Sequence, residues 1–134
     1  MADLIELEIV TPERQVVSDQ AEEIQIPGRG GYLGVLPGHA PLITELAVGD
    51  IVYRKGGETT HIAVAWGFAE VLPNKVTILA ETAERAEEID VVRAQAALKG
   101  SQERLAKADT EEKVEHELTA VRRAETRIEV ATKK

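Results

Sequence analysis

Apolar and polar residues alternate with a period of two in several short runs of the first 83 residues. Such alternation is typical of strands that bury one face and expose the other. The apolar residues of each run share a face, and the runs are Ile5-Leu7-Ile9, Ile24-Ile26, Ile62-Val64-Trp66 and Val76-Ile78-Ala80. We therefore expect an N-terminal region built from short strands.

Turn residues separate these runs. The segments Pro27–Gly31 and Pro37–His39 are rich in glycine and proline. Lys55-Gly56-Gly57-Glu58 suits a two-residue hairpin turn, because such a turn needs positive φ at both central residues. Many short strands with turns at this spacing predict a β-sandwich or a flattened barrel.

From about residue 84 the apolar pattern changes to a period of 3.6, which predicts helices. Asp109-Thr110 supplies a helix N-cap in the middle of this region. The apolar stripe before it is Val91, Ala94, Leu98, Leu105 and Ala108, and the stripe after it is Val114, Leu118, Val121, Ala124, Ile128 and Ala131. We expect residues 1–84 to form one domain and residues 85–134 an antiparallel helical hairpin. The mostly Ala and Val seam makes this hairpin only marginally stable by itself.

The chain has 134 residues and a formal net charge of -8, with a pI near 4.9. An acidic surface repels phosphate backbones and so disfavours nucleic-acid binding. The absence of cysteine excludes disulfides, thiolate metal sites and thiol catalysis. No apolar run approaches the roughly 20 residues of a membrane span, and no basic-then-apolar signal begins the chain. We expect a cytoplasmic protein that can sit on a membrane complex.

The residue types that catalysis needs are sparse. The only serines, Ser18 and Ser101, do not lie in a nucleophile elbow. The glycines of residues 28–34 lack the Lys-Ser/Thr of a phosphate loop, and Pro37 and Pro41 prevent the helix of a dinucleotide site. The three histidines lack the spacing of a metal site. We therefore expect neither a catalytic nor a metal site. A free-standing β-sandwich ligand-binding module with a coiled-coil dimerisation tail is one alternative, and a small enzyme is another.

The segment Gly31–Thr44 contains the run Leu-Gly-Val-Leu-Pro-Gly-His-Ala-Pro-Leu. It resembles the signature stretch of the epsilon subunit of bacterial F-type ATP synthases. Leu7–Glu13 resembles that family's first strand and turn, while Gly67–Val71 and Val76–Ala83 resemble its last β segments. The resemblance covers essentially the whole chain. It implies an α+β fold, with an antiparallel β-sandwich of about ten strands followed by a two-helix hairpin.

The resemblance also implies a non-catalytic rotor subunit that needs no catalytic cofactor. In this family the sandwich contacts the gamma subunit and the ring of c subunits, peripherally at the cytoplasmic face of the cell membrane, and the isolated chain is a monomer. We expect the contact residues in the Gly/Pro-rich region, because that region cannot bury all its apolar side chains locally. They are Tyr32, Leu33, Val35, Leu36, His39, Ala40, Pro41 and Leu42.

The helical hairpin is implied to be a switch. In this family it either folds against the sandwich or extends to the catalytic head of alpha and beta subunits, and the extended form inhibits ATP hydrolysis. The segment Ile89-Asp90-Val91-Val92-Arg93-Ala94 matches the Ile/Leu-Asp-x-x-Arg-Ala motif of epsilon subunits that bind ATP in the folded hairpin. Arg123 and Arg127 form the matching Arg-Ala-x-x-Arg pattern of the second helix.

The spacing supports a shared site. A turn near Asp109 puts Arg93 level with a position between Arg123 and Arg127, so three guanidinium groups converge. Grouped cations repel unless an anion intervenes, and arginine binds phosphate bidentately. The expected site for ATP, as a regulatory ligand, comprises Glu84, Ile89, Asp90, Arg93, Ala94, Arg123 and Arg127. Alternatively, Asp90, Glu125 and Glu129 neutralise these arginines on a solvated surface.

Overall fold

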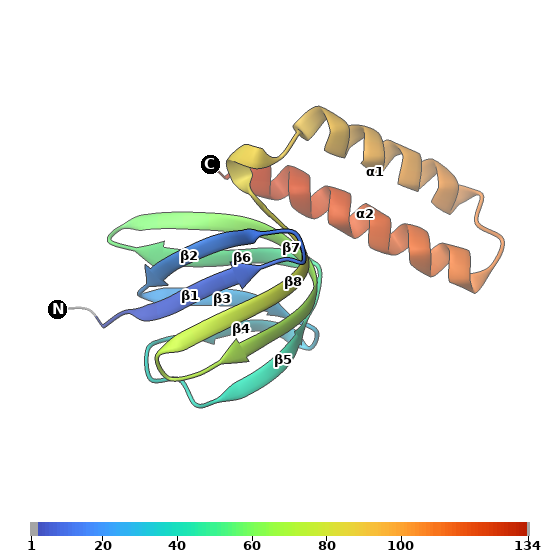
Figure 1. Cartoon of the computed structure of the whole chain (residues 1–134). Coiled ribbons are helices and arrows are strands. Elements are labelled where there is room, and N and C mark those ends of the chain that lie inside the picture. Colours follow the sequence, from blue (N-terminus) through green and yellow to red (C-terminus); the bar gives the residue numbers. More distant parts are fainter. Residues whose placement is uncertain (1–2, 134) are drawn as a thin grey trace.

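The computed structural model describes residues 3–133, and its eight strands form a β-sandwich beside a two-helix hairpin (Figure 1). The elements in chain order are β1 (Ile5–Val10), β2 (Gln15–Ala21), β3 (Glu23–Gly28), β4 (Gly31–Val35), β5 (Leu42–Leu46), β6 (Gly49–Lys55), β7 (Glu58–Val71), β8 (Lys75–Arg85), the 3-10 helix η1 (Ala86–Glu88), α1 (Val91–Ala106) and α2 (Glu111–Ala131). The α+β class expected from the sequence is confirmed.

The strands form one continuous ladder in the order β2-β1-β8-β7-β5-β3-β4, and β6 pairs with both β3 and β7. All paired strands are antiparallel except β1 and β8, which run parallel from Glu6 opposite Lys75 to Val10 opposite Leu79. The antiparallel arrangement expected from the sequence therefore has one exception, the parallel pair of β1 and β8. Strands joined by a tight turn must be antiparallel, whereas β1 and β8 are distant in sequence and are free of that constraint.

The sandwich has eight strands rather than about ten, because its longest strands serve both layers. Through residues 58–64 β7 pairs with β6, and through residues 67–71 it pairs with β5. The change of partner occurs at Trp66 and Gly67, whose φ angles are 56° and 122°. A Cβ atom at Gly67 would collide with the carbonyl oxygen of Leu79, so only glycine fits this bend.

The bend in β7 turns one expected core residue outward. Ile62 and Val64 are buried, but Trp66 is 36% exposed. The left-handed conformation of Trp66 interrupts the alternation of side chains between the two faces of the strand. The other apolar runs follow their predicted pattern, and a single core holds Ile5, Leu7, Ile9, Ile24, Ile26, Val76, Ile78 and Ala80.

The turn between β6 and β7 is the two-residue hairpin turn that the sequence predicts. Lys55 pairs with Glu58, and the two glycines between them have φ angles of 57° and 86°. Positive φ at both central residues gives the turn a twist that matches the flanking strands.

Each helix of the hairpin has an N-cap residue whose side chain accepts a hydrogen bond from the first turn. The Asp90 carboxylate accepts a hydrogen bond from the backbone N–H of Arg93 at 3.1 Å, which caps α1. Thr110 caps α2 in the same way, because its hydroxyl accepts from the N–H of Lys113 at 3.2 Å. The predicted start of the second helix is therefore confirmed, and the cap satisfies a backbone donor that has no partner within the helix.

The apolar stripe of α2 differs from the expected one near its start. Glu117 is 6% exposed, whereas Leu118 is 42% exposed. Glu117, Ala124 and Ala131 are all buried and lie seven residues apart, so this heptad row and not Leu118 faces inward. Local hydrophobicity favoured Leu118, but an ion pair across the hairpin retains Glu117 in the seam.

The hairpin lies along one side of the sandwich, with α2 nearer to it, and the turn that joins the helices points away (Figure 1). A small apolar cluster of Ala63, Ala86, Ile89, Val130 and Ala131 lies at this junction, separate from the main core. Neither helix, within the described residues, combines the length and hydrophobicity needed to cross a bilayer.

Candidate functional site

A cavity of about 390 Å³ lies between β8 and the two helices. Three arginines, Arg104, Arg123 and Arg127, contribute to its walls together with a single carboxylate, Glu84. Its remaining lining residues are Thr82, Ala97, Ser101, Ala120 and Ala124. A concave site that is lined by small side chains and several guanidinium groups has the chemistry to hold an anionic ligand.

Arg127 and Glu84 join α2 to the end of β8. Arg127 donates from Nε to Oε1 of Glu84 at 2.6 Å and from Nη2 to Oε2 at 3.2 Å. Both side chains are partly shielded, with exposed fractions of 26% and 31%. This paired geometry fixes the plane of the Arg127 guanidinium at the cavity wall.

Arg123 differs from Arg127 in its hydrogen bonding. Its Nε is buried and has no hydrogen-bond partner within residues 3–133. A buried charged donor without an acceptor is unfavourable, and an acceptor placed in the cavity would relieve it. Arg123 also lines a second, much smaller hollow of about 30 Å³ that adjoins Glu84 and Arg127.

The motif residues of α1 lie beside this cavity and not in its lining. Asp90 and Arg93 are both exposed, and Asp90 serves as the cap of α1. Arg93 is four residues before Ala97 and eight before Ser101, so it shares the helix face that lines the cavity. Ile89 and Ala94 are buried by packing.

The register of the hairpin brings Arg93 to the level of the α2 arginines. Arg104 lies across from Glu117. Arg93 is eleven residues before Arg104, so its level on α2 is eleven residues after Glu117, next to Arg127. The structure thus places Arg93 near the height expected from the sequence, while its side chain points into solvent.

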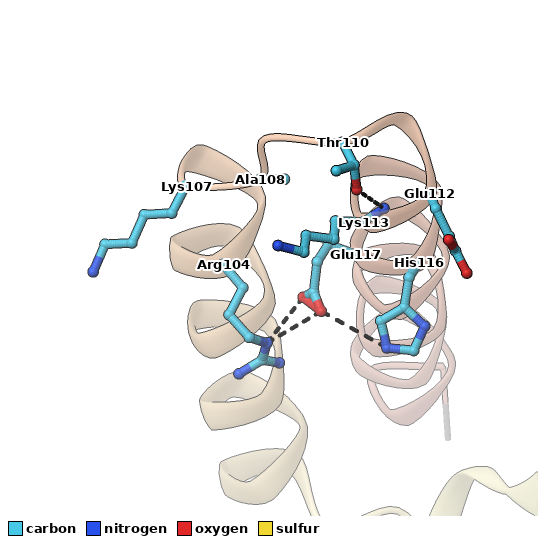
Figure 2. A pocket seen from close by; sticks show the side chains of 8 residues that line it. All are labelled: Arg104, Lys107, Ala108, Thr110, Glu112, Lys113, His116 and Glu117. Carbon is cyan, nitrogen blue, oxygen red and sulfur yellow. Dashed lines mark hydrogen bonds and ion pairs between the residues drawn. The ribbon is translucent and has the colours of Figure 1, made fainter.

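A larger cavity, of about 690 Å³, lies at the tip of the hairpin (Figure 2). Arg104 reaches across from α1 and meets Glu117 of α2, and His116 lies 3.9 Å from the same carboxylate. Lys107, Ala108, Thr110, Glu112 and Lys113 complete the lining. The chief polar contact at this level is therefore the pair that joins the helices.

The expected partner-contact residues divide into exposed and buried groups. Val35 is fully buried in the sandwich core, so the expectation that its side chain meets a partner is corrected. Leu33 is half-buried and packs on the same core. Leu36 and Leu42 are 58% and 38% exposed. Leu33 and Val35 share the inner face of β4, whereas Leu36 lies just after this strand and Leu42 begins β5.

The remaining residues of this group lie at the two ends of β4. Tyr32 is exposed, and its hydroxyl accepts a hydrogen bond from the backbone N–H of Asp50 at 3.2 Å. His39 lies in the turn after β4, with its Nδ1 at 2.6 Å from the carbonyl oxygen of Ala40. Ala40 and Pro41 are exposed in the same turn.

Sequence reasoning missed a buried polar group at the junction with the hairpin. Asp50 of β6 is 7% exposed and lies within hydrogen-bond distance of His61 on β7 and of Lys133 after α2. Asp50 follows a glycine at the start of a strand, where an aspartate ordinarily stays in solvent. No local pattern signals its burial or its partner 83 residues later.

Comparison with known proteins decides the family. The β-sandwich domain of the ATP synthase delta/epsilon chain matches residues 4–86, and the long α-helix domain of the same chain matches residues 87–132. The chain belongs to the family of ATP synthase epsilon chains. Such an epsilon chain is a non-catalytic subunit of the F-type ATP synthase, and this replaces both the small-enzyme and the free-standing-module alternatives.

Curated epsilon chains are similar along the whole sequence. The ATP synthase epsilon chain of Solibacter usitatus is 49% identical over 134 residues, which are 100% of both chains. That of Koribacter versatilis is 68% identical over 105 residues, which are 78% of this chain and 74% of the relative. That of Geotalea uraniireducens is 46% identical over 134 residues, which are 99% of this chain and 97% of the relative.

Two solved structures of ATP synthases contain a chain of similar fold. A chain in the Euglena gracilis mitochondrial ATP synthase structure of OSCP, F1 and c-ring has a TM-score of 0.81 at 25% identity, over 96% of this chain and 81% of that chain. A chain in the Tetrahymena thermophila mitochondrial central stalk and c-ring structure has a TM-score of 0.62 at 16% identity, over 96% and 94%. The second similarity concerns the fold alone.

Proposed function

We propose that the chain is the regulatory subunit of a bacterial ATP synthase central stalk. It links the ring of c subunits to the gamma subunit through its sandwich and restrains ATP hydrolysis with its hairpin. The similar Euglena chain belongs to a structure that contains F1 and the c-ring, which supports this placement. Such a subunit lies at the cytoplasmic face of the cell membrane and is held there by its partners.

The ring-facing part of the proposed interface is the turn between β4 and β5. Leu36 and Leu42 stay exposed at its two ends, and Ala40, Pro41 and His39 lie between them. Exposed apolar side chains in a glycine- and proline-rich turn offer contact area that the sandwich does not use for its own core. Tyr32 lies at the other end of β4 and belongs to the side that faces α2.

The hairpin is proposed to leave the sandwich and reach the catalytic head of alpha and beta subunits. The apolar cluster at the junction of hairpin and sandwich is small, and three of its five residues are alanine. Apolar contact therefore contributes little to the docked state. A modest difference in contact free energy is then sufficient to shift the population between the docked and the extended hairpin.

ATP is proposed to bind the docked hairpin in the cavity between β8, α1 and α2. The observation that carries this proposal is the buried Nε of Arg123, which lacks a partner within residues 3–133 and lies beside Arg127. The phosphates would bind these two guanidinium groups, Glu84 would position Arg127, and Arg93 would turn inward from α1. A ligand that binds the docked state alone stabilises it and opposes inhibition.

Calorimetric titration of the isolated chain with ATP tests the nucleotide proposal. Arg123→Ala and Arg127→Ala should each weaken binding by about tenfold or more, as expected for lost charge-assisted hydrogen bonds. Arg93→Ala should weaken binding as well, because its guanidinium is the one proposed to move. Arg122→Ala is the matched control, since Arg122 is exposed next to Arg123 and does not line the cavity.

The outcomes separate the two parts of the proposal. Absence of ATP binding to the unmodified chain would overturn nucleotide sensing and leave the stalk function unaffected. Binding that Arg122→Ala weakens as much as Arg123→Ala would show a diffuse charge effect, and the proposed cavity would be wrong.

A further inference from the structure

Lys133, which follows α2, forms an ion pair with the sandwich that no sequence motif indicates. The Nζ of Lys133 lies 3.4 Å from Oδ2 of Asp50 on β6, 83 residues earlier in the chain. The same ammonium lies 3.2 Å from Glu129, one turn back on α2. Lys133 therefore bridges a carboxylate of the helix and a carboxylate of the sandwich.

Asp50 is a poorly solvated carboxylate that depends on this contact. Its side chain is 10% exposed, and Nδ1 of His61 lies 2.8 Å from the same Oδ2. The other oxygen, Oδ1, is buried and has no hydrogen-bond partner within residues 3–133. Since a buried carboxylate is stable only with sufficient opposite charge and hydrogen bonds, removal of Lys133 leaves Asp50 with His61 as its one side-chain partner within residues 3–133 and disfavours the docked state that buries it.

The charge of Lys133 is secure in this environment. The hydrogen bond to Glu129 raises the pKa of Lys133, and the nearby charge of Asp50 raises this pKa further. A raised lysine pKa means that this contribution is fully present below about pH 10.4, the ordinary lysine value, and is lost only above it. The contact therefore persists across the physiological range.

The apolar contribution to docking at this end of α2 is small. Val130 and Ala131 are the residues of α2 that enter the junction cluster, and they meet Ala63, Ala86 and Ile89 there. Alanine removes little apolar area from water compared with leucine or isoleucine. Ion pairs, Lys133–Asp50 at this end and Arg127–Glu84 two turns earlier on α2, are therefore a substantial part of the docking interaction.

We propose that the Lys133–Asp50 ion pair is a latch that holds the end of α2 on the sandwich and must open before the hairpin can leave. The latch is separate from the proposed nucleotide site. It lines a hollow of about 310 Å³ whose residues are all different from those that line the arginine cavity. The latch rests on the proposed movement of the hairpin and not on the nucleotide site, and a ligand that binds only the docked hairpin would favour the closed latch.

Thiol labelling of the full chain measures the latch directly, because the natural sequence contains no cysteine. Ala131→Cys introduces one thiol at a position that is 5% exposed in the docked hairpin. A maleimide reagent in the absence of nucleotide then reacts mainly when the end of α2 leaves the sandwich. The labelling rate at low reagent concentration reports the population of the undocked state.

Lys133→Met in this background should raise the labelling rate by about three- to tenfold, the effect of a partly buried ion pair. Lys133→Arg should keep the rate within about twofold of the parent, because it retains the charge. Lys99→Met is the matched control, since Lys99 is exposed on α1. Asp50→Asn should also raise the rate, and adding Lys133→Met to Asp50→Asn should raise it little more.

An unchanged labelling rate in Lys133→Met would overturn the latch. So would a rise that Lys133→Arg reproduces in full, or fully multiplicative effects of Lys133→Met and Asp50→Asn. The thermal transition of the sandwich should stay unchanged in Lys133→Met, and a shift in it would mean that Lys133 supports folding and not docking.

Discussion

Arg104 of α1 donates from Nε to both carboxylate oxygens of Glu117 on α2, at 3.2 and 2.9 Å. Glu117 is almost fully buried in the hairpin seam, while Arg104 is 62% exposed. An ion pair therefore occupies a position that a helical hairpin ordinarily fills with an apolar side chain. This makes the separation of the helices sensitive to a single polar contact.

Removal of one partner should weaken the hairpin. Arg104→Met leaves the Glu117 carboxylate buried without its cation, and we expect a loss of about 1–3 kcal/mol of hairpin stability. Circular dichroism at the helical band, followed against temperature, measures this loss. The double substitution Arg104→Met with Glu117→Leu should recover the stability, because it replaces the pair with an apolar contact. Failure of the double substitution to recover it would contradict this interpretation.

Gly67 should be irreplaceable at the bend of β7. Gly67→Ala places a Cβ against the carbonyl of Leu79 at a φ of 122°, so we expect a loss of at least about 3 kcal/mol in the free energy of unfolding. Gly34→Ala is the control, because a Cβ there meets no atom within 4 Å. Urea denaturation of both variants measures the difference. Equal stability of the two variants would contradict the bend described for β7.

The stability of the junction at η1 should fall in acid. Arg14 lies 2.8 Å from the Glu88 carboxylate, and this hydrogen bond lowers the pKa of Glu88. A lowered carboxylate pKa gives stability that is present above the unfolded value of about 4.3 and is lost as pH falls through the folded pKa. Glu88→Gln should therefore reduce unfolding free energy at neutral pH by no more than about 1 kcal/mol, and by nothing in strong acid.

Urea denaturation of Glu88→Gln and the parent at a series of pH values tests this. Glu87→Gln is the control, because Glu87 is exposed and forms no ion pair within residues 3–133. An effect of Glu88→Gln that persists unchanged in acid would mean that Glu88 acts by packing and not by charge.

Substitutions of Val35 in β4 and of Leu36 in the following turn should distinguish an effect on stability from an effect on assembly. Val35→Ala removes core volume, and we expect a loss of about 1–3 kcal/mol of stability. Leu36→Ser changes an exposed side chain, so stability should stay within about 0.5 kcal/mol while binding to the purified c-ring and gamma subunit weakens. Co-sedimentation of each variant with these subunits measures assembly, and unimpaired binding of Leu36→Ser would contradict the proposed ring contact.

Local patterns predicted much of the fold because they report local physics. Period-two alternation located the core isoleucines of β1 and β3, and paired glycines defined the turn between β6 and β7. Thr110 was predictable as a cap because its side chain satisfies a donor three residues away. The class of fold follows from such signals together with the change of period near residue 84.

The remaining features depend on contacts between distant residues. Trp66 faces outward because a backbone bend overrides strand alternation. Glu117 is buried because Arg104 reaches it across the hairpin, and Asp50 is buried with a partner near the end of the chain. At the candidate site, the pattern indicated Arg123 and Arg127 but not their contacts, since Glu84 joins Arg127 only through the docking of α2 on β8.

The most direct test of regulation by the hairpin uses a chain that ends at Ala86, which retains every strand of the sandwich. The measurement is the ATP hydrolysis rate of the reconstituted ATP synthase complex with either the full chain or this shortened chain. We expect equal incorporation of both chains and a higher hydrolysis rate with the shortened one, because it lacks the helices that are proposed to inhibit hydrolysis. Equal incorporation with equal hydrolysis rates would contradict the proposed role of the hairpin.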